Sequence, residues 1–339
     1  MSQNKVVNGS RMPNSKEVAS LAKVSQATVS RVFSGQTNIR EQTRLKVLEA
    51  AEKIGYRPNA IARGLTLNRS NLIAIVSINV VNPHYNAMIN KVADRIQKLA
   101  REPLYFVCSE EKKLDEIISQ VLQYRVDGII VLSAAVSSQM AAECEKTQIP
   151  VVVFNKYTVN DNIMTVCSDN VRAGWMAANY LYDKGHRKYA FIGSNTFLGT
   201  SKDRLRGFKD ALYEKGIEKC EVQMVPYTYE AGGQAIRDIL SIERKTDAVF
   251  CAGDILALGA MDTIKYEYGL RIPEDIAILG FDNIDAASWP SYSLTTFEQQ
   301  IDKMLDTTFN YLSRKLNGEA VSEGIELFEC KIVERNSVL

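Results

Sequence analysis

Residues 14–33 read NSKEVASLAKVSQATVSRVF, which is a pattern of two short helices joined by a tight turn. Asn14 and Glu17 form a capping box at the start of the first helix, and Ser25 can cap the second, which runs through Thr28 to Phe33. The apolar side of the first helix consists of Val18, Ala19, Leu21 and Ala22. The second helix buries Val29 with Val32 or Phe33. The side chains left outside are Gln26, Ala27, Ser30 and Arg31.

A third helix is expected over residues 41–54, after Gly35 ends the second helix, and it stops at Gly55. Its predicted buried positions have helical spacing: Leu45, Leu48, Ala51 and Ile54. Three short helices with a tight first turn are typical of a helix-turn-helix DNA-binding domain. We therefore predict such a domain at residues 14–57, behind a disordered tail at residues 1–13.

The charge is distributed unevenly along the 339 residues. Residues 1–70 hold 12 Lys and Arg against 4 Glu, while the remaining chain holds 29 basic and 36 acidic residues. A basic segment ahead of an acidic body is typical of a nucleic-acid-binding module attached to a second domain. A solvated helical surface is the alternative interpretation of the charge taken alone.

Residues 58–70 form a weak helical segment between the two parts. Pro58 opens it, Gly64 lowers its helicity, and few apolar residues would hold it against a neighbour. We therefore expect this hinge helix to fray in isolation. Its Leu65 has the chemistry of a wedge that enters a DNA minor groove, and contact with the core domain is the alternative role of this leucine.

After Ser70 the sequence alternates between short β-branched runs and amphipathic helices, which predicts parallel sheets flanked by helices. The predicted strands are residues 72–78, 104–108, 127–132, 151–154, 189–192, 248–251 and 276–279, and the predicted helices include 171–184 and 203–215. Residues 71–339 suffice for an α/β core of two lobes that face each other across a ligand-binding cleft. We assign about 71–168 and 298–326 to the N-lobe, and about 169–297 and 327–339 to the C-lobe.

Two segments resemble the lactose-repressor and galactose-repressor family of bacterial transcription regulators. Residues 24–32, VSQATVSRV, resemble the family's turn and recognition helix, and residues 55–65, GYRPNAIARGL, resemble its hinge. Further family-like segments are NPHY at 82–85, KGHR at 184–187, RLRGF at 204–208, GDILALGA at 253–260, IPED at 272–275 and GFD at 280–282. The resemblance implies a periplasmic-binding-protein-like core behind an N-terminal all-α helix-turn-helix domain.

The recognition helix presents short polar side chains and one Arg, which suits a helix lying in a DNA major groove. Gln26 can read a base edge, Ala27 can touch a thymine methyl group, and Arg31 can bind guanine or phosphate. Phosphate contacts that fix the register are expected from Ser25, Thr28, Ser30 and Asn38. The resemblance adds Asn14 and three hinge residues that would fold against the operator in a dimer: Asn59, Ala62 and Leu65.

The resemblance also implies an effector site between the lobes. Asn155 can hydrogen-bond a hydroxyl, Arg204 can bind an oxygen or a carboxylate, and Asp282 can accept hydrogen bonds from sugar hydroxyls. Tyr227 matches an aromatic wall, and Asp254 shapes the site. The other transferred positions are His84, Tyr85, Thr200 and Gln299. Two positions depart from the family's pattern: His84, where an aromatic ring is common, and Gly253, where many relatives carry an amide. Helix caps and surface ion pairs are the alternative roles of these residues.

The sequence contains no G-x-G-x-x-G, P-loop, G-x-S-x-G or HExxH motif, so we expect no enzyme activity and no cofactor. The 6 cysteines lie far apart without a C-x-x-C pair, which predicts reduced thiols, no disulfide and no metal site. No long apolar run and no signal peptide is present, so we expect a cytoplasmic protein without a membrane partner. The last residues show no leucine heptad, so we expect a homodimer formed by the core without a coiled-coil tetramerisation tail.

These features predict a transcription regulator, a repressor, that binds a pseudo-palindromic double-stranded operator as a homodimer. A small effector bound between the core lobes would control its operator affinity. The resemblance implies a sugar or sugar phosphate, while the polar side chains also suit a nucleobase or an acidic metabolite. Whether the effector releases or strengthens DNA binding is left open. Two alternatives stay open as well: a sensory protein with a vestigial DNA-binding head, and a nucleotide-dependent α/β enzyme.

Overall fold

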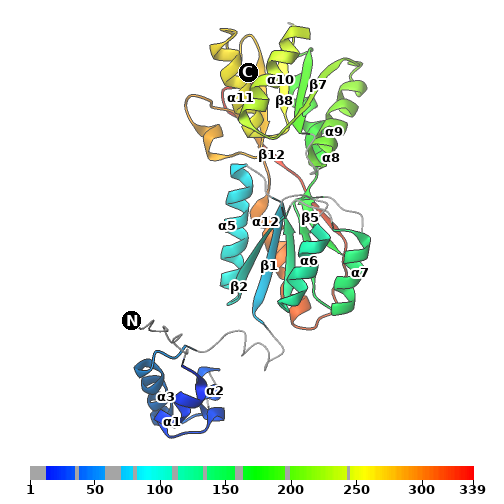
Figure 1. The fold of residues 1–339 in the computed structure, drawn as a ribbon. Coiled ribbons are helices and arrows are strands. Elements are labelled where there is room, and N and C mark those ends of the chain that lie inside the picture. The colour runs from blue at the N-terminus through cyan, green and yellow to red at the C-terminus, as the bar shows by residue number, and fades with distance from the viewer. Residues whose placement is uncertain are drawn as a thin grey trace, which may run out of the picture. The chain divides into compact units, whose positions relative to one another are not determined.

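The computed structural model describes residues 13–34, 38–57, 70–78, 82–108, 114–132, 136–156, 163–194, 199–242 and 245–339. The chain divides into two compact units, residues 1–70 and residues 71–339, which Figure 1 draws as ribbons. Several predicted features lie outside the described residues: positions 1–12 of the tail, Gly35, and the hinge helix with Asn59, Ala62 and Leu65.

The first unit contains three short helices: α1 (Ser15–Ala22), α2 (Gln26–Phe33) and α3 (Glu41–Lys53). The predicted capping box is present, because Asn14 Oδ1 accepts from the Glu17 N–H at 3.1 Å and the Glu17 carboxylate accepts from the Asn14 N–H. Val29 and Val32 are buried, and Phe33 packs beside them. The predicted helix-turn-helix fold is confirmed.

The predicted buried faces of α1 and α3 are partly wrong. Leu21, Leu45 and Leu48 are 43, 50 and 42% exposed. The α3 side chains buried instead are Val47, Ala50 and Ala51. Positions 47, 50, 51 and 54 have the same helical spacing as the predicted buried positions of α3. The small side chains of Ala50 and Ala51 let the three short helices pack closely. Spacing alone therefore does not distinguish the two overlapping faces.

The N-lobe is built on a parallel sheet, sheet A, in the order β11-β5-β4-β3-β1-β2. Its strands are β1 (Leu72–Ile78), β2 (Glu102–Cys108), β3 (Gly128–Leu132), β4 (Val151–Phe154), β5 (Met164–Ser168) and β11 (Ile325–Phe328). One face packs against α5 (Pro83–Lys98) and α12 (Ile301–Leu316), and the other against α6 (Leu114–Gln123) and α7 (Ser138–Thr147) (Figure 1). Continuous apolar runs such as LIAIVSI in β1 suit a sheet covered on both faces.

The C-lobe is built on a second sheet, sheet B, in the order β12-β10-β9-β8-β6-β7. Its strands are β6 (Tyr189–Ser194), β7 (Cys220–Val225), β8 (Ala248–Cys251), β9 (Ala277–Phe281), β10 (Thr295–Glu298) and β12 (Lys331–Val333), the last antiparallel to β10. One face packs against α8 (Asn170–Asp183) and α9 (Thr200–Glu214), and the other against α10 (Tyr229–Ile242) and α11 (Asp254–Tyr266). A short 3-10 helix, η2 (Asp285–Ser288), follows β9.

The chain crosses between the lobes after β5, before α12 and after β11. Ser168 Oγ donates to Gln299 Oε1 at 2.8 Å, and Gln300 Nε2 donates to the carbonyl of Glu329, so side chains tie the three crossing segments together. Since parallel strands end at one edge of a sheet, the loops with the predicted effector residues share the carboxyl edges. The predicted two-lobed, periplasmic-binding-protein-like fold is confirmed.

The sequence pattern does not predict five of the described strands: β5, β7, β10, β11 and β12. Their sequences, such as TTFE in β10 and KIV in β12, are short or mix polar with apolar residues. Strand β2 begins two residues earlier than predicted, at Glu102, because an edge strand tolerates Glu102 and Pro103. Strands that are short or lie at the edge of a sheet are therefore hard to predict from the periodicity of the sequence.

Helices α8 and α9 approach each other closely through two glycines. A Cβ on Gly207 would lie 1.9 Å from the carbonyl oxygen of Val171, and a Cβ on Gly174 would lie 1.9 Å from that of Arg204. Only a residue without a side chain fits at these two positions. The crossing brings the start of α8 beside Arg204 on α9, and it thereby positions part of the predicted effector site.

In the part of the chain that the structure describes, no helix is both long and apolar enough to span a membrane.

Candidate functional site

Helix α2 presents the predicted DNA-contacting residues on its exposed face. Gln26, Ala27, Ser30 and Arg31 are all exposed. Ser25 is the N-cap, and its Oγ accepts from the Thr28 N–H at 3.1 Å and lies 2.9 Å from Thr28 Oγ1. The hydroxyls of Ser25 and Thr28 therefore both take part in the cap of α2. The same hydroxyls could contact a phosphate while the cap stays formed.

Gln26 makes a contact that sequence reasoning missed. Its Nε2 donates to Ser15 Oγ at 2.8 Å, which joins the first residue of α2 to the first residue of α1. This bond orients the Gln26 amide on the exposed face of α2. Asn38 is exposed as well, whereas the Asn14 side chain is engaged in the cap of α1.

The predicted effector residues lie at the carboxyl edges of the two sheets. In sheet A, His84 follows β1 and Asn155 follows β4, and in sheet B, Tyr227 follows β7 and Asp282 follows β9. A hollow of about 380 Å³ opens beside His84 and Asp282, whereas Asn155 and Tyr227 are not among its lining residues. Its lining includes His84, Met88, Lys91, Asp282, Asn283 and Gln299. Residues from both lobes thus share one cavity.

Asp282 is the centre of a hydrogen-bond network that joins the lobes. Its Oδ1 accepts from Gln299 Nε2 at 2.9 Å, and its Oδ2 accepts from the Tyr227 hydroxyl at 3.0 Å. Gln299 Nε2 also lies 3.1 Å from His84 Nε2 in the N-lobe. This contact joins the N-lobe to the crossing segment that carries Gln299.

Arg204 on α9 is 4% exposed and is held on three sides. Its Nε donates to Asn170 Oδ1 at 2.8 Å, and its Nη1 donates to the carbonyl of Ala252 at 2.5 Å. The guanidinium carbon lies 3.3 Å from the centre of the Phe281 ring. A buried cation is stable only with such partners. Arg204 is therefore fixed in place in the unliganded chain, with further N–H groups that a ligand oxygen could meet.

Gly253 lets Tyr227 enter this network. A Cβ on Gly253 would lie 1.4 Å from Tyr227 Oη, so the phenol occupies the space that a side chain at position 253 would take. Burial raises the pKa of Tyr227 well above its usual value, and the charge of Asp282 acts in the same direction. The hydroxyl therefore keeps its proton and donates to Asp282.

Asp254 is completely buried and bonds to the interior of the C-lobe. Its Oδ1 accepts from Thr296 Oγ1 at 2.6 Å, and its Oδ2 accepts from the Ile284 N–H at 2.9 Å. Burial raises the pKa of Asp254 to about 7, and the charge of Asp282 raises it as well. Asp254 thus anchors the loop that carries Asp282, which is a positioning role.

We expect Asp254→Asn to remove a pH dependence from the stability of the core. The folded-state pKa of about 7 lies above the ordinary value of 3.8, so Asp254 stabilises the fold fully below pH 3.8 and loses this contribution as the pH rises through 7. The free energy of unfolding of the wild type, relative to Asp254→Asn, should fall by up to about 1.4 kcal/mol per pH unit over this range. Urea unfolding at several pH values measures the difference, and a difference that stays constant would contradict the raised pKa.

Three predicted residues stay at the margin of the network. Thr200 is buried at the start of α9, and Asn155 follows β4 with φ 59°, but neither side chain bonds to Asp282 or Arg204 in the described residues. Tyr85 packs edge-on against His84, with ring centroids 5.8 Å apart. Sequence reasoning missed the partners that hold the site together: Ser168, Asn170, Phe281, Thr296 and the Ala252 carbonyl. Of these, only Phe281 lies in a quoted motif, GFD at 280–282, and its contact with Arg204 joins residues that are distant in sequence.

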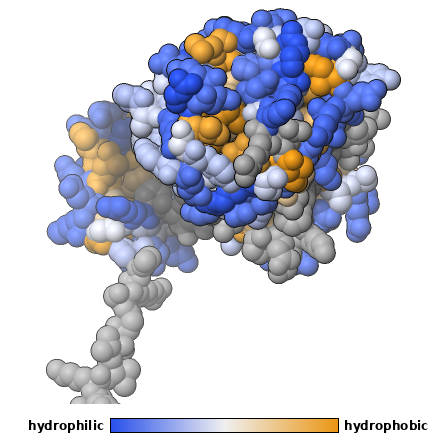
Figure 2. Space-filling model, turned by 90° about the horizontal axis from the view of Figure 1, so that it is seen from above, coloured by the Kyte–Doolittle hydropathy of each residue, from blue (hydrophilic) through white to orange (hydrophobic). Residues whose placement is uncertain are grey.

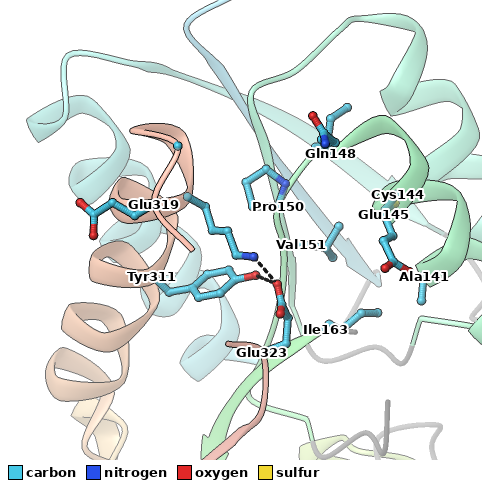
Figure 3. A pocket seen from close by; sticks show the side chains of 13 residues that line it. Ala141, Cys144, Glu145, Gln148, Pro150, Val151, Ile163, Tyr311, Glu319 and Glu323 are labelled. Carbon is cyan, nitrogen blue, oxygen red and sulfur yellow. Dashed lines mark hydrogen bonds and ion pairs between the residues drawn. The ribbon is translucent and has the colours of Figure 1, made fainter. Parts of the chain in front are cut away.

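A second hollow, of about 490 Å³, lies in the N-lobe beside the start of β4 and the ends of α7 and α12 (Figure 3). The Lys315 ammonium and the Tyr311 hydroxyl both bind the Glu323 carboxylate, at 2.5 and 3.0 Å, and Glu319 pairs with Arg314. These charged and polar groups are paired with one another by hydrogen bonds and ion pairs, so we assign no ligand to this hollow. Among the described residues, no group of His, Cys, Asp and Glu side chains is arranged to hold a metal ion.

Comparison with known proteins identifies the family of this chain. Residues 15–59 match the bacterial regulatory proteins of the lacI family, and residues 178–338 match a periplasmic binding protein-like domain. The chain is 30% identical over 325 residues to the HTH-type transcriptional repressor CytR of Escherichia coli (strain K12), with 95% of each chain covered. The chain belongs to the lacI family.

Other known proteins are similar to this chain in sequence or in fold. Catabolite control protein A of Priestia megaterium is 31% identical, with 95% of this chain and 98% of the relative covered. The lac repressor dimer bound to operator and the anti-inducer ONPF has the same fold, with a TM-score of 0.85 at 24% identity, covering 97% of this chain and 100% of that one. The transcriptional regulator CelR in complex with cellobiose has a TM-score of 0.70 at 25% identity, covering 96% and 99%. The family predicted from the motifs is confirmed, and its related members are transcription regulators.

Proposed function

We propose that this chain represses transcription by binding operator DNA as a homodimer, and that a small effector bound between the core lobes changes its operator affinity. The observation that carries the proposal is the buried network of Arg204, Tyr227 and Asp282 at the lobe boundary of a chain that also presents an exposed recognition helix. The relative CytR is named a repressor, and the lac repressor neighbour is a dimer on its operator. This role requires no enzyme activity, and it places the protein with the DNA in the cytoplasm.

In this proposal residues 14–57 bind DNA, residues 58–70 form the hinge, and residues 71–339 form the effector-binding core. Gln26, Ala27 and Arg31 read the operator in the major groove. Phosphates are held by Asn14, Ser25, Thr28, Ser30 and Asn38, and the minor groove is entered by Asn59, Ala62 and Leu65.

The effector is a sugar or a sugar phosphate in this proposal. Charged and amide groups come from Arg204 and Asp282 in the C-lobe and from Gln299 in the crossing segment before α12, which suits a ligand rich in oxygen. The N-lobe contributes His84, Tyr85 and Asn155, while Thr200, Tyr227 and Asp254 shape the C-lobe wall. The CelR neighbour was solved with cellobiose, which supports this ligand class.

Regulation follows from the position of the site between the lobes. A ligand that contacts both lobes binds one lobe arrangement better than another, and only this difference in affinity can change operator binding. The bonds among Ser168, Gln299 and Asp282 connect the cavity directly to the crossing segments. A ligand that changes the angle between the lobes would therefore move the three crossing segments that connect them.

The dimer contact is proposed at two exposed apolar areas of the core. Tyr105 and Val107 are 46 and 49% exposed on β2, the edge strand of sheet A, and Ile242 and Tyr266 are 62 and 81% exposed on α10 and α11. Apolar side chains of this exposure on an edge strand and on neighbouring helices are typical of a self-association surface. Figure 2 shows apolar patches separated by hydrophilic surface on the face seen from above.

Selection of bound sequences from a random duplex library tests the DNA-binding half of the proposal. The full-length chain should enrich a pseudo-palindrome, because a symmetric dimer reads two half-sites. The selected operator then allows effector screening by loss or gain of binding. A library that shows no enrichment, with or without candidate sugars, would refute the repressor function.

We expect Arg31→Ala to weaken binding to the selected operator by roughly 5- to 150-fold, since a base or phosphate contact by Arg contributes about 1–3 kcal/mol. Lys53→Ala is the matched control, because it removes one exposed positive charge from α3 and leaves α2 unchanged. Fluorescence anisotropy with the operator duplex measures both variants at one salt concentration. Equal affinities of Arg31→Ala and wild type would remove Arg31 from the interface.

A further inference from the structure

A side-chain hydrogen bond joins the first residue of α1 to the first residue of α2. Gln26 Nε2 donates to Ser15 Oγ at 2.8 Å, and Gln26 is exposed while Ser15 is half-buried. The two helices already pack through buried side chains such as Val18 and Val29. Water competes for a hydrogen bond at the surface, so this bond adds little to the stability of the unit. Its main effect is to fix the direction of the Gln26 side chain.

The neighbouring polar side chains serve the helix caps, whereas Gln26 does not. Asn14 caps α1 and is paired with Glu17, and Ser25 caps α2. Among the residues that the structure describes, the Gln26 amide bonds only to Ser15. Its oxygen, Oε1, and one of its two N–H groups therefore stay unpaired on the exposed face of α2.

The unpaired groups of the Gln26 amide can form one recognition edge. An amide carries one N–H beside its oxygen and a second N–H that points away from it. A bond from the outer N–H to Ser15 leaves the oxygen and the inner N–H free, side by side. In the major groove, adenine presents an acceptor, N7, beside a donor group, N6, and this pair complements that edge. Guanine presents two acceptors, N7 and O6, so only one of them could be matched.

Holding the amide in advance favours base readout over general DNA affinity. A free Gln side chain loses rotamer freedom when it is ordered in an interface, and this loss opposes binding. The bond to Ser15 orders the side chain before DNA arrives. Only a correctly directed amide forms both bonds to one base, while the attraction to phosphates depends on the Lys and Arg charges. The contribution of Ser15 should therefore appear in base discrimination.

We propose that Ser15 is a positioning residue for DNA readout, which holds the Gln26 amide so that it binds adenine in each operator half-site. Ser15 contacts no base itself and acts through Gln26. The proposal rests on the proposed function and deepens it, because it names a base that the operator contains. The test separates this role from a phosphate contact by the Ser15 hydroxyl and from a purely structural bond between α1 and α2.

The test uses the full-length chain and the random duplex library. Selections with the wild type and with Gln26→Ala identify the base pair that Gln26 reads, because the preference at that pair is lost in the variant. Fluorescence anisotropy then compares the selected operator with operators in which this pair is replaced in one half-site. Ser15→Ala removes the hydroxyl, and Ser15→Thr keeps one. Ser20→Ala is the matched control, because Ser20 is exposed on α1 and its hydroxyl has no hydrogen bond within the described part of the chain.

We expect adenine at the position that Gln26 reads, with the wild type binding the replaced operators roughly 5- to 150-fold more weakly. Ser15→Ala should lower this discrimination at least about twofold, because the Gln side chain must then be ordered on binding. The affinity for the adenine operator should fall, and the affinity for the replaced operators should not. Ser15→Thr and Ser20→Ala should discriminate as the wild type does.

A base other than adenine at the position that Gln26 reads would overturn the proposal. A Ser15→Ala chain that discriminates like the wild type would overturn it too, and so would one that binds every operator more weakly by the same factor, as a phosphate contact or a structural role requires. The melting temperature of each variant shows whether it is folded. If the wild type enriches no sequence, the repressor function fails and the adenine readout fails with it, whereas an enriched operator without this adenine overturns only the role of Ser15 and Gln26.

Discussion

Gly207→Ala should lower the free energy of unfolding of the core by about 3 kcal/mol or more. An Ala in the middle of a helix normally stabilises it by about 0.5–1 kcal/mol relative to Gly, so the expected effect has the opposite sign. The reason is the new Cβ, which would lie 1.9 Å from the carbonyl oxygen of Val171 on α8. Backbone atoms cannot yield as a flexible side chain can, so the two helices must separate.

The separation of α8 from α9 in Gly207→Ala should also disturb the proposed effector site. Asn170 begins α8, and its Oδ1 accepts from Arg204 Nε at 2.8 Å, so moving α8 away from α9 breaks this bond. The control is Asp210→Ala, which places an Ala on the exposed side of the same helix, α9. Urea unfolding followed by circular dichroism compares the three chains. A Gly207→Ala midpoint equal to that of the wild type would show that α8 and α9 do not pack as closely as described.

Gly207 shows which features of the fold are predictable from the sequence and which are not. The stretch RLRGF at residues 204–208 resembles a family motif, and the helix that contains it is predictable from its periodicity. The reason for the glycine is not predictable, because the close approach depends on Gly174 and Val171 of another helix. Residue type alone cannot distinguish a close helix crossing from a flexible position.

Strands are predictable to the extent that both of their faces are buried. The continuous apolar runs of β1, β4 and β8 predict the observed bounds, because a parallel strand covered on both faces has little polar surface. Strand β10, with the sequence TTFE, pairs with the edge of β9, and β12, with the sequence KIV, pairs in turn with β10. Pairing between distant segments therefore supplies the part of the fold that local pattern does not.

The candidate site is likewise predictable only in part, because its residues are visible in the sequence but their contacts are not. Asp282 is predictable from the GFD motif, and Tyr227 and Gln299 are predictable from the family resemblance, but the hydrogen bonds among the three are not. The absence of a side chain at Gly253 is visible in the sequence, whereas the presence of the Tyr227 hydroxyl in that space depends on the way β7 and β8 both flank β6. Positions are thus predictable one by one, and the network only from the structure.

Arg204→Met should abolish the effector response while it leaves operator binding without effector within about threefold of the wild type. Charge-assisted hydrogen bonds contribute about 1.5–3 kcal/mol each, so loss of the guanidinium should raise the half-maximal effector concentration roughly 10- to 100-fold or beyond measurement. Met nearly matches the length of Arg and can still cover the Phe281 ring, which the guanidinium carbon now approaches to 3.3 Å. The substitution therefore removes the donors without leaving a large cavity.

Arg206→Met is the control for this last experiment. Arg206 lies on the same helix, its side chain is 63% exposed, and it pairs with Asp203 at 3.4 Å, so its loss should change neither effector response nor stability. Operator binding is measured by fluorescence anisotropy as a function of effector concentration, with the melting temperature of each variant as a check on folding. Arg204→Met also leaves Asn170 Oδ1 without its donor, so its melting temperature should fall even where operator binding persists. A folded Arg204→Met chain that responds at the wild-type effector concentration would exclude Arg204 as the anchor, and the ligand would then be held by the remaining proposed residues, Asp282 and Gln299 among them.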